Sequence, residues 1–122
     1  MVKKPNFSFK KEEHLKGRKE IQTVFNKGKR FSCQGAKLIV LKNDLPINRI
    51  CFSLSRGFTN AVARNRAKRL GREAYRLLKG HTCGGHDLIF LVYQETGITL
   101  SHRMKQLEIL LNKAGLTGLI IR

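Results

Sequence analysis

Acidic residues are scarce in this chain of 122 residues. Asp and Glu number 8 against 25 Lys and Arg, which gives a formal net charge of +17. A small soluble domain needs a net charge of only about 2–8 in magnitude, and the excess destabilises a compact fold unless an anionic partner neutralises it. The few carboxylates form no D-x-D pair or cluster of the kind that holds two catalytic metal ions. We therefore expect an anionic partner, with nucleic acid favoured over an anionic membrane surface, and no catalytic centre in the chain itself.

Long apolar runs and paired cysteines are also missing. No run approaches the ~20 apolar residues that span a bilayer, and the basic segment Met1–Asn6 is not followed by the apolar core of a signal peptide. Cys33, Cys51 and Cys83 lie far apart in the sequence, as expected of reduced thiols in a cytoplasmic protein. The run His81-Thr-Cys83-Gly-Gly-His86 offers three zinc ligands without a nearby fourth. We interpret it as a polar glycine-rich loop, with a zinc site as the less favoured alternative.

The apolar pattern predicts a single domain over residues 1–122, and the excess of basic residues makes it a candidate RNA-binding domain. We expect a basic N-terminal arm over 1–17, helices over 18–27, about 60–79 and about 100–114, and strands within 31–41, 48–55 and 88–93. Asn60 is a suitable N-cap for the long helix. The turn signal Asn43–Pro46 suggests that the first two strands pair antiparallel. This order predicts an α/β, or α+β, two-layer sandwich with helices packed on a small mixed sheet.

The helix expected over 60–79 carries a basic stripe. At about 100° per residue, Arg64, Lys68, Arg72 and Arg76 follow one another along one side, and the opposite arc is apolar. Solvated helices usually mix charge signs, because like charges at i,i+4 cost a few tenths of a kcal/mol each. Arginine suits bidentate contacts with phosphates, so the stripe predicts a nucleic-acid-binding surface. A DNA-binding helix-turn-helix is disfavoured, because a strand is expected where its first helix would stand.

The segment Asn60-Ala-Val-x-Arg64-Asn65-Arg66-x-Lys68-Arg69-Leu-x-Arg72-Glu73 resembles the arginine–asparagine–arginine signature of the bacterial ribonuclease P protein subunit. The resemblance extends over nearly the whole chain, through 7–15, 24–31, 87–91 and 107–114. It implies a sandwich with a left-handed βαβ crossover, like that in the second domain of a small-subunit ribosomal protein. Such a crossover is an exception to the right-handed rule.

The resemblance also implies a function. A protein of this family binds the catalytic RNA of ribonuclease P and the 5′ leader of precursor tRNA, and it enhances substrate affinity and Mg²⁺-dependent endonucleolytic removal of the leader. The RNA subunit is the catalyst, so we expect the chain alone to be inactive, with no catalytic residue of its own. Mg²⁺ would be held mainly by the RNA and the substrate. We expect no organic cofactor, no membrane association and no obligate protein partner.

The resemblance and the basic stripe together give two sets of site residues. Those expected to contact RNA are Arg56, Asn60, Arg64, Asn65, Arg66, Lys68, Arg69, Arg72 and Arg76. Those expected to line a cleft for the leader are Phe25, Lys29, Arg30 and Phe31. Both phenylalanines fit the apolar core equally well. Arg66, at the border of the helix face, could reach either a partner or the sheet edge.

The chain departs from the family pattern at several positions. In the turn before the signature helix, Gly57 replaces a lysine, Phe58 fills the apolar position and Thr59 replaces a glycine. The chain would therefore make one phosphate contact fewer there, with Arg30 or Arg49 available to compensate. Ile21 replaces a phenylalanine and Cys51 a glycine. A structural rRNA binder on the same fold is the alternative function, which the signature disfavours.

Overall fold

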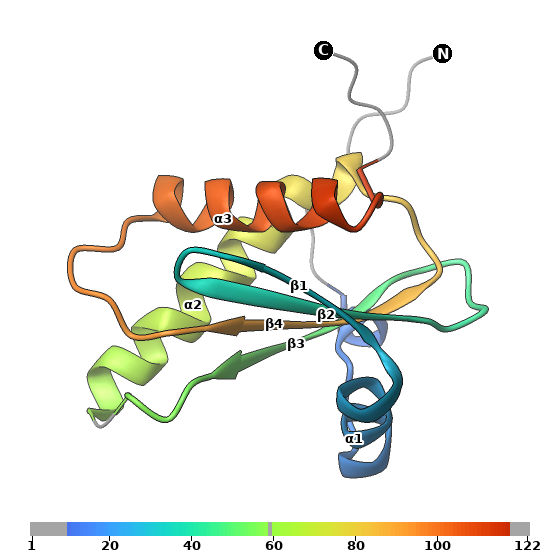
Figure 1. Cartoon of the computed structure of the whole chain (residues 1–122), viewed down its shortest axis with the longest axis horizontal. Coiled ribbons are helices and arrows are strands. Elements are labelled where there is room, and N and C mark those ends of the chain that lie inside the picture. Colours follow the sequence, from blue (N-terminus) through green and yellow to red (C-terminus); the bar gives the residue numbers. More distant parts are fainter. Residues whose placement is uncertain (1–9, 59, 118–122) are drawn as a thin grey trace.

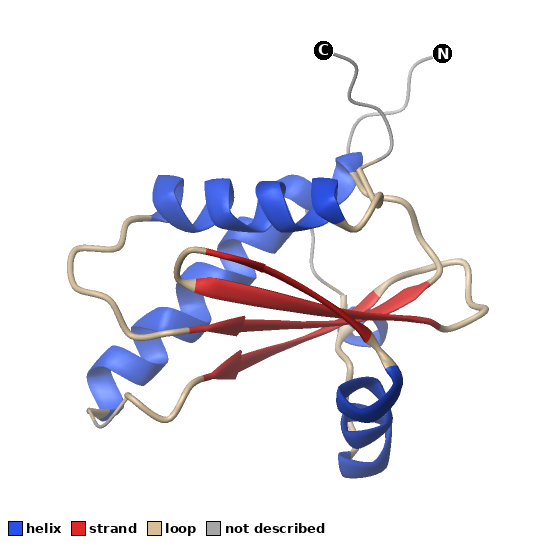
Figure 2. Ribbon diagram, viewed as in Figure 1, coloured by secondary structure: helices blue, strands red, loops and turns tan. Residues whose placement is uncertain are grey.

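The computed structural model describes residues 10–58 and 60–117. Four strands form one sheet in the order β1-β2-β4-β3, with α2 and α3 on one face and α1 on the other (Figures 1 and 2). None of the helices in this described part is long and apolar enough to cross a membrane. The elements in chain order are η1 (Lys11–Glu13), α1 (Arg18–Lys27), β1 (Lys29–Cys33), β2 (Ala36–Lys42), β3 (Arg49–Leu54), α2 (Ala61–Leu78), η2 (Lys79–His81), β4 (His86–Val92) and α3 (Leu100–Lys113).

The three predicted helices are confirmed to within a residue or two, as is the N-cap at Asn60. The region 31–41, predicted to hold one strand, lies instead in a hairpin of β1 and β2. Its turn uses Gly35 at φ +86°, a conformation that glycine adopts without strain. Of the predicted basic arm, residues 1–9 lie outside the described residues, and Leu15 is buried.

The predicted antiparallel pairing of the strands around Asn43–Pro46 is wrong. β4 lies between them, antiparallel to β2 and parallel to β3. Leu88, Ile89 and Phe90 of β4 are each at most 1% exposed, because β4 is covered on both faces. A strand with apolar side chains on both faces is most stable at the centre of a sheet, and this preference outweighs the short connection between β2 and β3.

The connection from β3 through α2 to β4 is a βαβ unit. In Figure 1, β3 and β4 both run to the left, β4 lies above β3, and α2 passes behind the sheet. That arrangement is a left-handed crossover, opposite to the usual hand. The handedness implied by the resemblance is therefore confirmed.

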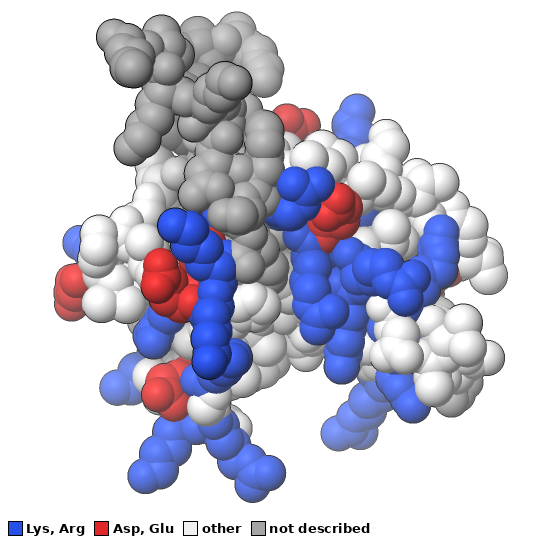
Figure 3. Space-filling view, turned by 180° about the vertical axis from the view of Figure 1, so that it is seen from behind, with Lys and Arg blue, Asp and Glu red and all other residues white. Residues whose placement is uncertain are grey.

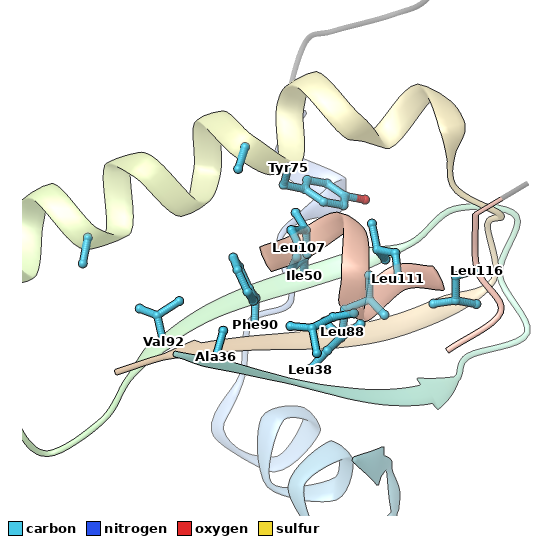
Figure 4. Packing of buried hydrophobic residues seen from close by; sticks show 13 residues of the cluster. Ala36, Leu38, Ile50, Tyr75, Leu88, Phe90, Val92, Leu107, Leu111 and Leu116 are labelled. Atoms are coloured by element: carbon cyan, nitrogen blue, oxygen red, sulfur yellow. The ribbon is translucent and has the colours of Figure 1, made fainter. Parts of the chain in front are cut away.

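Side chains alternate between two apolar clusters of unequal size. Leu38, Ile50, Leu88 and Phe90 face α2 and α3 and form the larger cluster, together with Tyr75 and the leucines of α3 (Figure 4). On the other face a smaller cluster is built from Leu15, Val24, Ile39 and Ile89. The alternation follows from the two-residue period of a strand.

The N-terminal segment covers the edge strand β3. His14 forms a parallel bridge with Ile50, and the Leu15 amide donates to the Ile50 carbonyl at 2.9 Å. The Lys79 Nζ atom lies 2.7 Å from Glu13 Oε1, and both side chains are nearly buried. The described part of the N-terminal segment is thus held to the end of α2, and it shields an edge that would otherwise be open to pairing.

Gly71 sets the distance between α2 and the sheet. A Cβ atom at this position would lie 2.9 Å from Cδ1 of Phe52, too close without movement of the ring. The aromatic ring of Phe52 therefore fills the space that a larger residue in α2 would take, and it contacts Tyr75 and Phe90 edge to face.

We predict that Gly71→Leu destabilises the protein. Overpacking costs about 1–3 kcal/mol, which exceeds the gain of about 0.8 kcal/mol in helix propensity. Phe52→Leu in the same chain should recover part of the loss, because it returns volume to the contact. Chemical denaturation of the single and double variants measures this coupling. The control Ala61→Leu, at an exposed position of the same helix, should change the free energy of unfolding by no more than about 0.5 kcal/mol. Additive effects of the Gly71 and Phe52 substitutions would contradict the prediction.

Candidate nucleic-acid interface

The basic side of α2 begins at a well-formed cap. Asn60 Oδ1 accepts hydrogen bonds from the amides of Val62 at 2.7 Å and Ala63 at 3.3 Å. The first turn of α2 carries no acidic residue, so a neutral side chain alone satisfies these amides. The positive end of the helix dipole is left without a carboxylate of its own, which favours an external anion.

We call the predicted RNA-contacting side chains on α2, from Arg64 to Arg76 but without Arg66, the basic ridge. Arg64, Asn65, Arg69 and Arg72 are exposed, and Lys68 and Arg76 are half-buried at its margins. The opposite arc, with Ala67, Gly71, Ala74 and Tyr75, is buried. The predicted two-sided helix is thus confirmed, although Gly71 and Tyr75 were not expected in the buried arc.

Most cations of the basic ridge are left for an outside partner. In the described part of the chain the salt bridges are Arg49–Asp87, Arg76–Glu73 and Lys79–Glu13. Only Arg76 belongs to the ridge, and its contact with Glu73 lowers the pKa of that carboxyl. Arg64 donates one weak hydrogen bond, at 3.3 Å, to the carbonyl of Phe58.

Figure 3 shows the molecule from behind, with α2 toward the viewer. Basic side chains gather over α2 and, separately, over α1, and uncharged surface lies between the two groups. Arg56 is exposed in the turn that precedes α2. The two basic groups on either side of an uncharged strip could hold the phosphates of a nucleic-acid strand while its bases face the strip.

The uncharged strip includes the α1-facing side of the sheet. Cys51, Ser53 and Leu91 are half-buried there, and their partners in the register place them on the same face as Ile89. Lys68 borders the strip from α2. Burial raises the pKa of the Cys51 thiol, and the positive charge of Lys68 lowers it by a smaller amount.

Phe25 and Arg30 lie together at the α1 edge of this strip. Phe25 is half-buried against the smaller apolar cluster. The guanidinium of Arg30 lies 6.0 Å from the centre of its ring, and Nη2 donates to the Phe25 carbonyl at 2.8 Å. Lys29 is exposed, but it pairs with Val40 in the β1–β2 register, which places its side chain on the same face as Phe31 and away from this strip. Phe25 thus has features of both predicted alternatives, since part of it packs in the core and part remains accessible.

Phe31 is not at this edge. It pairs with Leu38 in the β1–β2 register, which places both side chains on the face covered by α2 and α3, and it packs against the larger apolar cluster. Of the two alternatives for Phe31, the structure supports the core. The cleft prediction is wrong here, because the unforeseen hairpin fixes which way each β1 side chain points.

Two other arginines have structural partners. Arg66 is exposed, and it donates from both Nη atoms to the carbonyl of Ile98, at 3.2 and 3.0 Å, so its side chain crosses from the border of the helix to the loop before α3. Arg49 binds Asp87 through Nε at 2.8 Å and Nη2 at 2.7 Å. The suggestion that Arg49 compensates for the missing lysine of the turn is therefore not supported. In the turn, Phe58 packs on the larger cluster, and Thr59 lies outside the described residues.

Sequence reasoning did not anticipate His14. Burial has the largest effect on the pKa of His14 and lowers it. The charges of Lys16 and of Arg72 on the basic ridge lower this pKa further, whereas Glu13 raises it. The N-terminal segment therefore sits next to the basic ridge, a neighbourhood that no local pattern reveals.

The described residues include no group of three or more His, Cys, Asp or Glu side chains that could hold a metal ion. Cys33, Cys51 and Cys83 are free thiols. The Asn48 side chain donates to the carbonyl of Cys83 at 2.8 Å, and its oxygen accepts from the His86 amide at 2.9 Å. The glycine-rich loop is thus fixed by hydrogen bonds to Asn48.

Comparisons with known proteins agree with this geometry. Residues 9–115 match the model of the family described as Ribonuclease P. The ribonuclease P protein component of Clostridium acetobutylicum is 37% identical over 109 residues, covering 87% of this chain and 92% of the relative. That of Alkaliphilus metalliredigens is 30% identical over 104 residues, covering 79% and 94%. The structure of the Staphylococcus aureus RNase P protein superposes with a TM-score of 0.75 at 25% identity, covering 94% of this chain and 99% of that one.

We predict that His14 makes stability depend on pH. Its pKa is below 6.5 in the folded protein, so the unfolded chain binds more protons as the pH falls through 6.5. The free energy of unfolding should therefore decrease in that range, and His14→Gln should flatten the decrease. Urea denaturation between about pH 5 and 7.5 measures it. The same substitution at exposed His102 should leave the profile as it is; equal slopes for His14→Gln and the unaltered protein would contradict the prediction.

Proposed function

Since the chain belongs to the ribonuclease P protein family, we propose that it binds ribonuclease P RNA through the basic ridge. As a member of this family it is a subunit of a tRNA-processing endoribonuclease and partners with that RNA. In the same proposal, the 5′ leader of precursor tRNA binds along the α1-facing side of the sheet. In this proposal the chain increases substrate affinity and promotes hydrolysis of the phosphodiester bond that releases the leader and leaves the mature tRNA 5′ end. We place this activity in the cytoplasm.

The observation that carries the proposal is the separation of free cations from paired ones. The salt bridges of the described residues lie along the seams between elements or at the margin of the ridge. Arg64, Arg69 and Arg72 are exposed on one side of a rigid helix. A row of positive side chains on one side of a helix suits the phosphate backbone of a folded RNA. Each phosphate that they neutralise releases counterions.

The leader is assigned to the α1-facing side by its chemistry. The strip of Cys51, Ser53 and Leu91 is uncharged and half-buried. Lys68 lies near Cys51 on one side of it, and Arg30 lies over Phe25 on the other. Single-stranded RNA is held by such a combination, with phosphates on cations and bases on apolar or aromatic surface. Phe25, under the guanidinium of Arg30, is the residue best placed to stack on a base.

We assign the chemical step to the RNA subunit. Mg²⁺ prefers several oxygen ligands, usually with carboxylates among them. Asp87, Glu13 and Glu73 are each bound to a cation of this chain, and the described acids do not form a metal-binding group. The residues present therefore do not fit a Mg²⁺ site of the chain's own, and in this proposal the ion is held by the RNA and the substrate.

Reconstitution tests the proposal directly. The chain, freed of nucleic acid, is mixed with bacterial ribonuclease P RNA and a precursor tRNA at low, near-physiological Mg²⁺, and leader release is followed. We expect cleavage in the complete mixture and none with the chain alone. RNA binding without any stimulation of cleavage would instead favour a structural RNA-binding role.

We predict that the triple substitution of Arg64, Lys68 and Arg72 by Gln weakens binding of ribonuclease P RNA by about tenfold or more at ~0.15 M salt. The slope of log K against log salt should become shallower by about 0.9 for each phosphate that is no longer neutralised. Filter binding at several salt concentrations measures both quantities. A matched triple variant, Lys42, Lys105 and Lys113 to Gln, removes the same charge elsewhere on the surface and should change the slope much less. An unchanged slope in the ridge variant would refute the role of these residues.

We predict that Phe25→Leu weakens binding of precursor tRNA to the holoenzyme by about fivefold or more, since a stacked base contributes about 1–3 kcal/mol. Binding of a leaderless tRNA should not change, because the leader alone would contact Phe25. Phe31→Leu, a matched substitution on the other face of the sheet, should leave the ratio of the two affinities unaltered. An equal effect of Phe25→Leu on both RNAs would show that Phe25 serves the core only.

A further inference from the structure

A cavity of about 340 Å³ lies between α2, the loop over residues 94–98 and the first turn of α3. It is distinct from the exposed side of the basic ridge and from the α1-facing side of the sheet. Phe58, Leu70 and Ile98 contribute apolar lining, and Arg66, Glu95 and Arg103 contribute charge. A volume of this size with an apolar lining and a few charged groups is typical of small-molecule sites.

Arg103 is the unusual member of this lining. Its side chain comes from α3 and the residue is only 2% exposed. Nη1 donates to Gln106 Oε1 at 2.8 Å, while the buried Nε has no hydrogen-bond partner among the described residues. Burial lowers the pKa of Arg103, as does the charge of Arg66, whereas Glu95 raises it. Arginine nevertheless stays protonated in proteins, so a buried cation remains incompletely compensated here.

The charges of Arg66 and Glu95 do not fully neutralise the guanidinium of Arg103. Arg66 is held at the cavity by its two hydrogen bonds to the Ile98 carbonyl, and it adds a second positive charge. Glu95 is exposed, and its Oε1 accepts from Gln106 Nε2 at 3.3 Å. Two guanidinium groups therefore face one carboxylate around the cavity, which leaves an excess of one positive charge and several N–H donors beside an apolar wall.

We propose that this cavity binds one nucleotide, with its phosphate between Arg66 and Arg103 and its base or sugar against Phe58 and Leu70. Guanidinium groups bind phosphate oxygens through charge-assisted hydrogen bonds, and an incoming phosphate would supply the negative charge that the site lacks. The nucleotide is either free or an unpaired nucleotide of the RNA partner. The RNA source rests on the proposed function, whereas binding of a free nucleotide does not.

Titration of the isolated chain tests the site without any RNA. AMP, inorganic phosphate and adenosine are added separately, and heteronuclear NMR follows the backbone amides and the arginine Nε–H signals. We expect saturable binding of AMP with shifts at Phe58, residues 94–98 and Arg103, and binding at least about tenfold weaker for adenosine and for phosphate alone. Shifts that spread evenly over the basic ridge would overturn the proposal in favour of unspecific attraction of anions.

Three variants sharpen the test. Arg103→Gln should weaken AMP binding by about tenfold or more, and Lys105→Gln, which removes the same charge from an exposed position of the same helix, by less than about twofold. Glu95→Gln should strengthen AMP binding, because it removes the competing carboxylate; its exposed position makes this variant informative even if Arg103→Gln proves poorly folded in a thermal melt. Equal affinities for the Arg103, Lys105 and Glu95 variants would overturn the proposal.

The source of the nucleotide follows from a parallel measurement with ribonuclease P RNA. If Arg103→Gln weakens RNA binding more than Lys105→Gln does, the site takes a nucleotide of the RNA. If it weakens AMP binding alone, the ligand is a free nucleotide. Failure of the chain to stimulate leader cleavage would reject the proposed function and leave the AMP result unaffected.

Discussion

The fold depends on burying both faces of the central strand β4. Leu88 and Phe90 face α2 and α3, and Ile89 faces α1, so helices must lie on both sides of a sheet that has only four strands. The chain meets this requirement by passing through α2 between β3 and β4 and by folding α1 against the opposite face. Burial of these side chains, each worth about 1.5–3 kcal/mol, outweighs the local preference for pairing neighbouring strands in a hairpin.

Packing helices on both faces of the sheet also decides where the Lys and Arg side chains lie. Each helix buries one side, and the excess of Lys and Arg is left on the outer surfaces. Two of the eight carboxylates hold elements together: Asp87 binds Arg49 and the side chain of Asn43, and Glu13 binds Lys79 from the N-terminal segment. Few acids remain to neutralise the exposed arginines of α2. The self-repulsion that results is the cost of a surface ready for a polyanion, and it favours association at low salt over the isolated state.

The departures from the family pattern are absorbed by packing. Phe58 joins the larger apolar cluster and lines the cavity next to Arg66, and Ile21 and Cys51 pack against the smaller cluster. Arg66 is a signature residue that serves the fold, because its hydrogen bonds to Ile98 tie α2 to the loop before α3. A guanidinium has five N–H donors, so the same side chain keeps donors for the phosphate that we propose it binds.

The sequence alone determined the features that arise from neighbours along the chain. Periodicity defined the three helices, the cap at Asn60 and the basic side of α2, since these depend on residues within a few positions of each other, and the signature identified the family. The order of the strands, the side of the sheet that Phe31 faces, the capture of Arg49 by Asp87 and the burial of Arg103 were decided only by the tertiary structure. Each of these depends on pairing between segments far apart in the sequence, where a shift of one residue in register reverses the direction of every side chain, and no local pattern records that choice.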